Sequence, residues 1–368
     1  MPNSISQRFK FLRDQRGLSQ DDISRALGFK DRQTVSAIET GERRLSAVEL
    51  VKASDVFAVN LDYFTDPFLL VGEGKFSWRQ KDVPVRALAA YEQDAGRMIA
   101  AFRTLAPQVG EDLPLLRRAL GLSKLSTYEE ASDAGERLAA EYQLGEAPAL
   151  RLATVMEREL GILVLMVDPI DGISGAACRL PELDVVLINR REVPGRRHFD
   201  LAHELFHILT WDAMPPEHIE ETTPTKRNRV EQLADNFASA VLMPYTVLKE
   251  KAHWSKLKLD DLVDHLNGVA IELGVSTSAL RWRLVHLGLI DKRLAESIRE
   301  ERLRYNGHVN AVPEAPPLLF SKPFMHVIAK ALDEGQVTVR RISSILGMTI
   351  DDLADLFNSH GVDTPYEL

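Results

Sequence analysis

The sequence predicts a mainly helical protein with a small β-sheet, an α+β fold of more than one domain. Most of the chain places apolar residues at helical spacing, whereas two short apolar runs, 161–167 and 184–188, have the length and β-branched content of strands. A length of 368 residues exceeds one usual domain and suggests two or three. We expect units at 1–66, 67–145, 146–310 and 311–368.

The first unit has the pattern of five short helices separated by glycine or polar turns. We expect them at residues 4–16, 20–27, 31–39, 46–57 and 61–64. Ser19 followed by Asp22 has the spacing of a capping box, which favours a helix that begins at residue 20. The apolar side chains expected to form the core of this unit are Ile23, Ala26, Leu27, Val35, Ile38 and Leu50.

The rest of the chain alternates between breaks and helical stretches. Turn-forming residues at 65–80 predict a linker, and residues 84–145 predict accessory helices. Further helices are expected at 195–210, 226–242, 257–273, 276–287 and 292–305. From Ser321 onward the pattern predicts a small helical unit with breaks at Gly335, Gly347 and Gly361.

Composition excludes several classes of protein. A single cysteine, Cys178, excludes an internal disulfide framework and a multi-thiolate metal site. The longest apolar run, 162–167, is far shorter than the roughly 20 residues that cross a bilayer, and the first residues carry no signal-peptide pattern, so we expect a cytoplasmic protein with no membrane partner.

The charge is unevenly distributed. The whole chain carries −9, but residues 1–60 hold ten Lys and Arg against eight Asp and Glu, so this segment is +2 and the remainder −11. A locally basic surface for nucleic acid is therefore compatible with an acidic protein.

A candidate metal site begins with two histidines, His203 and His207, that lie four residues apart. On a helix this spacing sets two imidazoles one turn apart on the same face, as two ligands of one Zn²⁺ must be. Glu204 follows the first histidine, where its carboxylate can act on a metal-bound water. By itself such a pair is more often structural, and the apolar flanks and the preceding strand favour the metal site.

A second predicted helix supplies the remaining carboxylates. Glu231 can complete a ligand set of two histidines and one carboxylate, which leaves the fourth position to water. Asp235, one turn later, can accept the free N–H of a ligating histidine and fix its tautomer. Zinc would lower the pKa of its water toward about 7 and polarise a carbonyl, while Glu204 would take the proton and pass it to the leaving amine. A peptide bond is the expected substrate.

These motifs resemble the ImmA/IrrE family of zinc metallopeptidases. The resemblance rests on His203-Glu-Leu-Phe-His207 and on the stretch 231–244, and it covers about 150–290. It implies a gluzincin-like core, His203, His207 and Glu231 as zinc ligands, and Glu204 as the catalytic residue. It also implies a helix-turn-helix repressor as the protein substrate. The chain has Phe206 where the family often has glycine.

Residues 18–44 are similar to the Cro/C1-type (XRE) helix-turn-helix family. Polar residues lie at the start of the predicted helix 31–39, which is where the recognition helix of such a module reads base edges. The resemblance implies a double-stranded DNA operator as partner, and the modest charge favours a homodimer on a two-fold site. The expected contacts are base edges for Arg32, Gln33, Thr34 and Ser36, and phosphates for Gln20, Arg43 and Arg44. The alternative is a helical bundle that binds protein.

Together the motifs predict a stress, phage or mobile-element regulator that joins a DNA-binding domain to a zinc endopeptidase. Its substrate would be a repressor, an antitoxin or the chain itself near residues 65–82. Two alternatives stay open: a transcription factor whose metal domain is a non-proteolytic sensor or structural module, and a component of a toxin–antitoxin pair.

Overall fold

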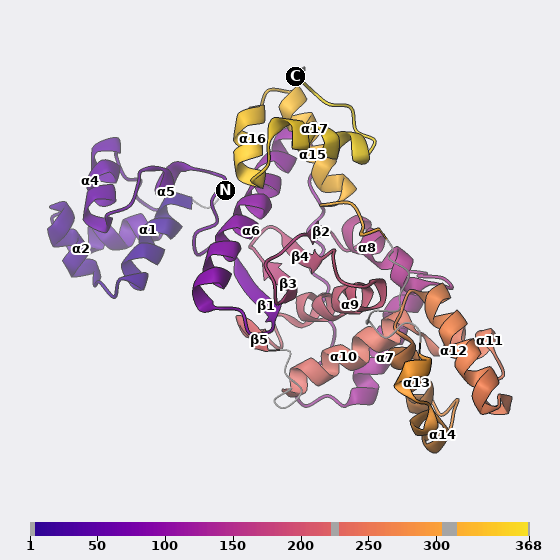
Figure 1. Cartoon of the computed structure of the whole chain (residues 1–368). Helices are drawn as coiled ribbons and strands as arrows, with labels where there is room; N and C mark the ends of the chain where they lie inside the picture. Colours follow the sequence, from indigo (N-terminus) through magenta and orange to yellow (C-terminus); the bar gives the residue numbers. More distant parts are fainter. Residues whose placement is uncertain (1–3, 222–227, 304–314, 367–368) are drawn as a thin grey trace.

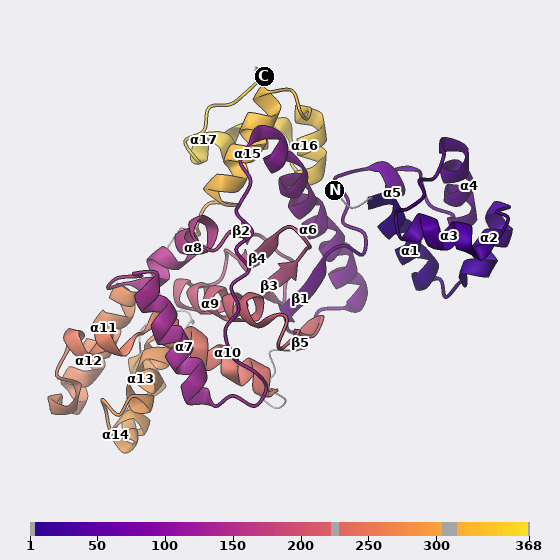
Figure 2. The ribbon, with the colours of Figure 1, turned by 180° about the vertical axis from the view of Figure 1, so that it is seen from behind.

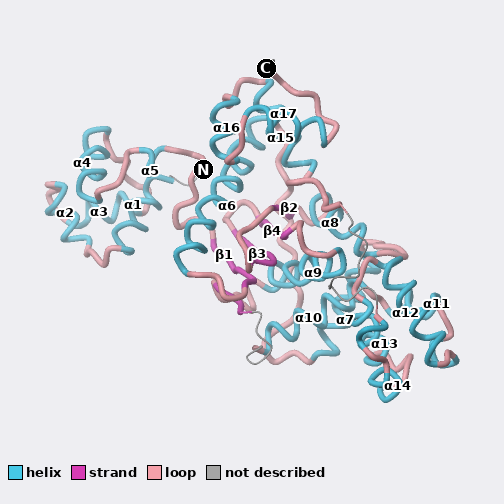
Figure 3. Tube along the Cα trace, viewed as in Figure 1, coloured by secondary structure: helices cyan, strands magenta, loops and turns pink. Residues whose placement is uncertain are grey.

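A computed structural model of the chain describes residues 4–221, 228–303 and 315–366 (Figure 1). Helices surround one small sheet, as the colouring by secondary structure in Figure 3 makes plain, so the predicted fold class is confirmed. Within the described residues, no helix has both the length and the apolar character needed to cross a membrane. The division into four units remains a prediction.

The N-terminal bundle contains helices α1 to α5 and protrudes from the remainder of the molecule (Figures 1 and 2). The structure matches the five predicted helices to within about a residue, and the Ser19–Asp22 capping box is present. Ala26 was wrongly assigned to the core: it is exposed, because α2 turns Ile23, Ser24 and Leu27 inward instead. The bounds are Ser4–Gln15 (α1), Gln20–Leu27 (α2), Arg32–Glu39 (α3), Ala47–Phe57 (α4) and Asp62–Thr65 (α5).

The sheet has five strands in the order β2-β4-β3-β1-β5. β3 runs antiparallel to both of its neighbours, whereas β2 pairs with β4 and β1 with β5 in parallel. The predicted strands correspond to β2 and β4, and the other three were not expected. The bounds are Lys75–Gln80 (β1), Ile162–Val167 (β2), Ile173–Arg179 (β3), Asp184–Asn189 (β4) and Ile219–Glu221 (β5).

The linker predicted at 65–80 is wrong in its second half, because β1 occupies the last six of those residues. Phe76 and Trp78 lie two positions apart on the same face of this strand, and their rings stack in the core with centroids 5.3 Å apart. The segment before β1 is also fixed: Glu73 pairs with Arg8 of α1 at 3.3 Å and with Arg103 of α6 (Val85–Leu105). β1 is therefore part of the central sheet, and ion pairs anchor the segment that joins it to the N-terminal bundle.

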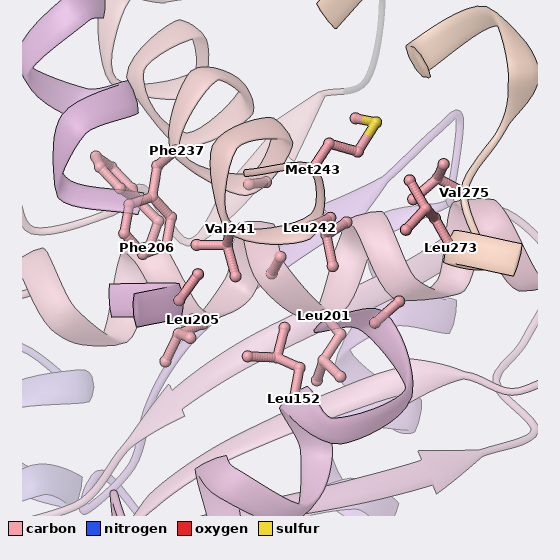
Figure 4. Close-up of a cluster of buried hydrophobic side chains, with 14 of the residues drawn as sticks. Leu152, Leu201, Leu205, Phe206, Phe237, Val241, Leu242, Met243, Leu273 and Val275 are labelled. Atoms are coloured by element: carbon pink, nitrogen blue, oxygen red, sulfur yellow. The ribbon is translucent and has the colours of Figure 1, made fainter. Parts of the chain in front are cut away.

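The sheet separates two hydrophobic cores. Alternate residues of one strand point to opposite faces, so that Val164 joins one core and Leu163 the other. The first core packs helices α7 to α10 and α12 to α13, and Figure 4 shows part of it, where α9 meets α10. Their bounds are Tyr128–Glu141 (α7), Pro148–Arg158 (α8), Pro194–Thr210 (α9), Arg229–Leu242 (α10), Leu259–Leu273 (α12) and Thr277–His286 (α13).

The helices α7 and α10 approach closely at Gly135. A Cβ on this residue would lie 2.6 Å from the carbonyl oxygen of Phe237, which is closer than a side chain can come. Only glycine permits this helix spacing. The predicted accessory helices at 84–145 therefore include one that packs directly on the helix that carries Glu231.

The second core joins α6 to the C-terminal helices, which cover the upper end of α6 in Figure 1. Phe102 of α6 stacks on Phe324 with ring centroids 6.1 Å apart. The predicted breaks at Gly335, Gly347 and Gly361 are observed. The bounds are Lys322–Asp333 (α15), Val339–Leu346 (α16) and Ile350–Ser359 (α17).

One predicted helix is shorter than expected, another has its expected start outside the described residues, and two observed helices were not predicted. The helix predicted at 292–305 is α14 (Lys292–Ser297), followed by a short 3₁₀ turn, and residues 304–305 lie outside the described residues. Residues 226–227, the expected start of another helix, also lie outside them, and α10 begins after Asn228, which caps it. The missed helices are α8 and α11 (Tyr245–Lys251).

Candidate metal centre

Helix α9 presents the two histidines in the interior of the protein. Pro194 begins the helix, and apolar residues on several sides bury its second half. His203 and His207 are fully buried, and their Nε2 atoms lie 3.1 Å apart. The predicted one-turn spacing thus brings both imidazoles to the same small volume.

Helix α10 brings the third ligand candidate to this volume. Glu231 lies in its first turn, where Asn228 accepts a hydrogen bond from the Glu231 amide at 3.0 Å and fixes the start of the helix. Its carboxylate oxygens lie 3.2 Å from Nε2 of His203 and 3.6 Å from Nε2 of His207.

The two helices are held in register by aromatic packing next to the histidines. The rings of Phe206 and Phe237 lie 5.5 Å apart between α9 and α10 (Figure 4). Phe206, which stands where glycine is common in the ImmA/IrrE family, therefore points into the core.

His203, His207 and Glu231 form a possible metal site, because one ligand atom from each lies within 4.8 Å of the others. Burial lowers the pKa of His207 to about 3, so its imidazole is neutral and able to ligate. Burial acts to raise the pKa of Glu231, but His203 and the positive charge of Arg79 outweigh it, and this pKa falls to about 2. Both groups thus have the unprotonated form that a metal requires near neutral pH.

Asp235 lies one turn beyond Glu231 on α10. Its Oδ1 is 3.0 Å from Nδ1 of His203, the ring nitrogen that faces away from the ligand cluster. An N–H on Nδ1 directed at this carboxylate leaves the lone pair on Nε2. The geometry is the one that the sequence predicts for this pair.

Glu204 is fully buried beside the histidines and beneath β3. A Cβ on Gly175 of β3 would lie 3.6 Å from Cγ of Glu204, so the carboxyl group sits against the strand. Neither of its oxygens has a hydrogen-bond partner among the described residues. Burial raises its pKa to about 7, which places the group between its acid and base forms near neutrality.

Arg79 of β1 is a residue of the site that the sequence analysis missed. Its Nη1 lies 2.7 Å from Nε2 of His203, and its Nε lies 3.1 Å from Oδ1 of Asp200. Burial and this positive charge act to lower the pKa of His203, but its contacts with the carboxylates of Asp235 and Glu231 outweigh them and raise this pKa to about 10 in the absence of a metal. The only signal in the sequence was the alternation of aromatic and polar residues at 76–79.

Three further residues could by type stabilise a developing oxyanion: His218, Tyr245 and His253. The structure pairs two of them with other residues and leaves the third exposed. His218 lies 2.6 Å from Glu92, the backbone N–H of Tyr245 donates to Glu136, and His253 is exposed. The described cation that contacts the cluster is Arg79, at His203.

The expected DNA-contacting residues are distributed around α2 and α3. Arg32 and Gln33 are exposed in the first turn of α3, and Arg44 is exposed after it. Gln20 donates to Glu39 at 2.9 Å, and Arg43 pairs with Glu49 at 2.6 Å.

Two further predicted DNA contacts, Thr34 and Ser36, are half-buried. The hydroxyl of Thr34 donates to Asp31, the residue that caps α3, at 3.1 Å. Arg32, Gln33 and Arg44 therefore present the most accessible polar groups of the predicted set.

Comparison with protein families gives two matches. Residues 158–285 match the IrrE N-terminal-like domain, and residues 9–64 match the helix-turn-helix family. The first match contains β2, β3, β4, α9 and α10, and therefore the whole metal cluster. No curated protein matches the chain. Both resemblances seen in the sequence are confirmed, and Arg79 lies outside both matched ranges.

Proposed function

We propose that this chain is a DNA-binding regulator whose second domain is a zinc-dependent endopeptidase. One observation carries the proposal: the ligand atoms of His203, His207 and Glu231 converge beside the buried, unpartnered carboxylate of Glu204. The pairing of a helix-turn-helix domain with an IrrE N-terminal-like domain supports it.

The ligand atoms fit a zinc ion in their spacing as well as in their chemistry. Zinc bound at about 2.0–2.1 Å in a tetrahedron places neighbouring ligand atoms about 3.3 Å apart. The separations in this site are 3.1, 3.2 and 3.6 Å. Two imidazole nitrogens with one carboxylate form a donor set typical of catalytic zinc, which leaves a position open.

A bound zinc ion would supply Lewis-acid activation of water and polarisation of the scissile carbonyl. His203, His207 and Glu231 would hold the ion, and Asp235 would keep Nδ1 of His203 protonated so that Nε2 faces the ion. Glu204 would accept the proton of the attacking water at its carboxylate and deliver it to the leaving amine. A pKa near 7 suits both transfers.

The proposed substrate is a helix-turn-helix repressor or an antitoxin, and the chain itself is the other candidate. The DNA-binding half would dock on an operator through Arg32, Gln33, Thr34 and Ser36, with Gln20, Arg43 and Arg44 near phosphates. Exposure of Arg32 and Gln33 at the start of α3 supports this orientation. A homodimer on a two-fold operator would double these contacts.

A second candidate function is a regulator whose metal domain is a sensor or structural module without proteolysis. The contact of Arg79 with Nε2 of His203 favours it, because a cation already stands at a ligand atom. The two candidates differ in what Glu204 does, since only a peptidase needs a general base.

Mass analysis of cleavage products tests the proposal. The zinc-loaded chain is incubated with a repressor encoded beside its own gene, and both proteins are followed by intact mass. We expect fragments with the wild type and none with Glu204→Gln, whereas Glu157→Gln, another buried glutamate with a pKa raised to about 7 by burial, retains cleavage. Equal fragmentation by Glu204→Gln would refute the peptidase role of Glu204.

A further inference from the structure

Arg79 is held beside the metal cluster by a strand that cannot easily leave. β1 pairs with β3 on one side and with β5 on the other, and Arg79 stands opposite Gly175, the residue that covers Glu204. Its neighbours Ser77 and Trp78 are completely buried, and the indole of Trp78 donates to Glu92 at 2.6 Å. The backbone of Arg79 is thus held by pairing on both sides, and its side chain is the part that can move without breaking that pairing.

Arg79 occupies the space in front of the nitrogen with which His203 would bind a metal. A guanidinium has N–H groups and no acceptor, so in a hydrogen bond between the two groups Nη1 of Arg79 donates and the lone pair on Nε2 of His203 accepts; the two atoms lie 2.7 Å apart. The position of Asp235 next to Nδ1 agrees with this tautomer. That lone pair is the one with which His203 would bind a metal, and it cannot do both at once.

The distances make the conflict unavoidable. An ion bound to Nε2 of His203 at about 2.0–2.1 Å would lie no more than about 4.8 Å from Nη1 of Arg79 in the described conformation. The guanidinium is nearly buried, so two positive charges would face each other with little water between them. In the described conformation, the guanidinium lies 3.1 Å from a carboxylate oxygen of Asp200 and 4.0 Å from one of Glu231.

We propose that Arg79 is an internal competitor for the metal, which occupies the ligand atom of His203 and must withdraw before an ion binds. This inference rests on the metal site of the proposed function and adds a residue that regulates metal binding at that site. The side chain of Arg79 would set the metal affinity of the chain, and its position would decide whether the site is open.

Arg196 provides a matched control. It lies on α9, carries the same charge and also faces Asp200, with its Nε 3.8 Å from Oδ2, but its side chain is half exposed and donates to Ser174 instead of to a histidine. Arg79→Met and Arg196→Met each remove one positive charge and each leave Asp200 with one arginine. They differ in which of them frees the lone pair of His203.

The test measures zinc affinity of the full, metal-stripped chain by competition with a chromogenic zinc chelator. We expect Arg79→Met to bind Zn²⁺ at least about tenfold more tightly than the wild type, and Arg196→Met to stay within about threefold of it. Arg79→Lys keeps the charge near Asp200 but ends one bond short of the position of Nη1, so it should also bind more tightly. Because it retains the ion pair, this variant guards against failure to fold.

Three results would overturn the inference. Affinity of Arg79→Met equal to that of Arg196→Met would show that Arg79 does not compete. A gain in Arg79→Met that is absent in Arg79→Lys would assign the effect to charge and not to occupation of the lone pair. If neither the wild type nor Arg79→Met binds zinc in preference to His203→Ala, the metal site of the proposed function fails together with the competitor.

Discussion

The buried carboxyl group of Glu157 predicts a pH-dependent stability that one substitution should remove. Glu157 lies on α8, is 9 % exposed, and has one oxygen without a hydrogen-bond partner among the described residues. Burial raises its pKa from 4.5 to about 7, although contacts with Ser321 and with the Val164 backbone oppose the rise. The folded protein therefore holds this proton more tightly than the unfolded chain.

The sign and size of the effect follow from the pKa difference. Between pH 4.5 and pH 7 the folded state binds more protons, so the free energy of unfolding falls as the pH rises. At about 1.4 kcal/mol per pKa unit, the loss is under about 1 kcal/mol at pH 5 and about 3 kcal/mol at pH 8. Glu157→Gln keeps the shape of the side chain and removes its titration.

Urea unfolding of the wild type and of Glu157→Gln at pH 5 and pH 8 measures the effect. Other groups titrate equally in both proteins, so the difference between their free energies of unfolding isolates Glu157. The variant should gain about 2–3 kcal/mol relative to the wild type between the two pH values. A difference that does not change with pH would refute the argument from burial.

Three further changes have expected outcomes. Asp235→Asn should weaken zinc binding by about 10- to 100-fold in the chelator assay, because it loosens His203; unchanged affinity would contradict the role. Gly135→Ala should lower the free energy of unfolding by about 1–3 kcal/mol, because its Cβ would lie 2.6 Å from a backbone oxygen. The urea midpoint should therefore fall, and an unchanged midpoint would contradict this. Arg32→Ala with Gln33→Ala should abolish operator gel shift, and retained binding would reject the α3 orientation.

The convergence of the candidate ligand residues could be predicted from sequence because part of their geometry is local. Two histidines four residues apart on one helix face each other whatever surrounds them. Glu231 needed a second helix to pack at the correct place, and the expectation succeeded because the helix carrying it is long, amphipathic and capped at Asn228. The five helices of the N-terminal bundle could be predicted because their apolar spacing and capping residues are also local features of the sequence.

Arg79 could not be predicted because a strand is defined by partners far away in the sequence. The segment 75–80 pairs with residues 173–179, about 100 positions later, and the glycines before it have the composition of a linker. The strand β3, with Gly175, Ala176 and Ala177, also lacks the bulky residues that mark β2. Non-local pairing thus hid Arg79, a residue that contacts the candidate metal site from outside the predicted motifs.

The central claim is that two imidazoles and one carboxylate converge on a single zinc ion. Metal content of the zinc-loaded, desalted chain, measured by mass spectrometry beside His207→Ala and Glu231→Ala, tests it most directly. The account predicts one equivalent of zinc in the wild type and substantial loss in each variant. Zinc absent from the wild type, or retained in full by both variants, would contradict it.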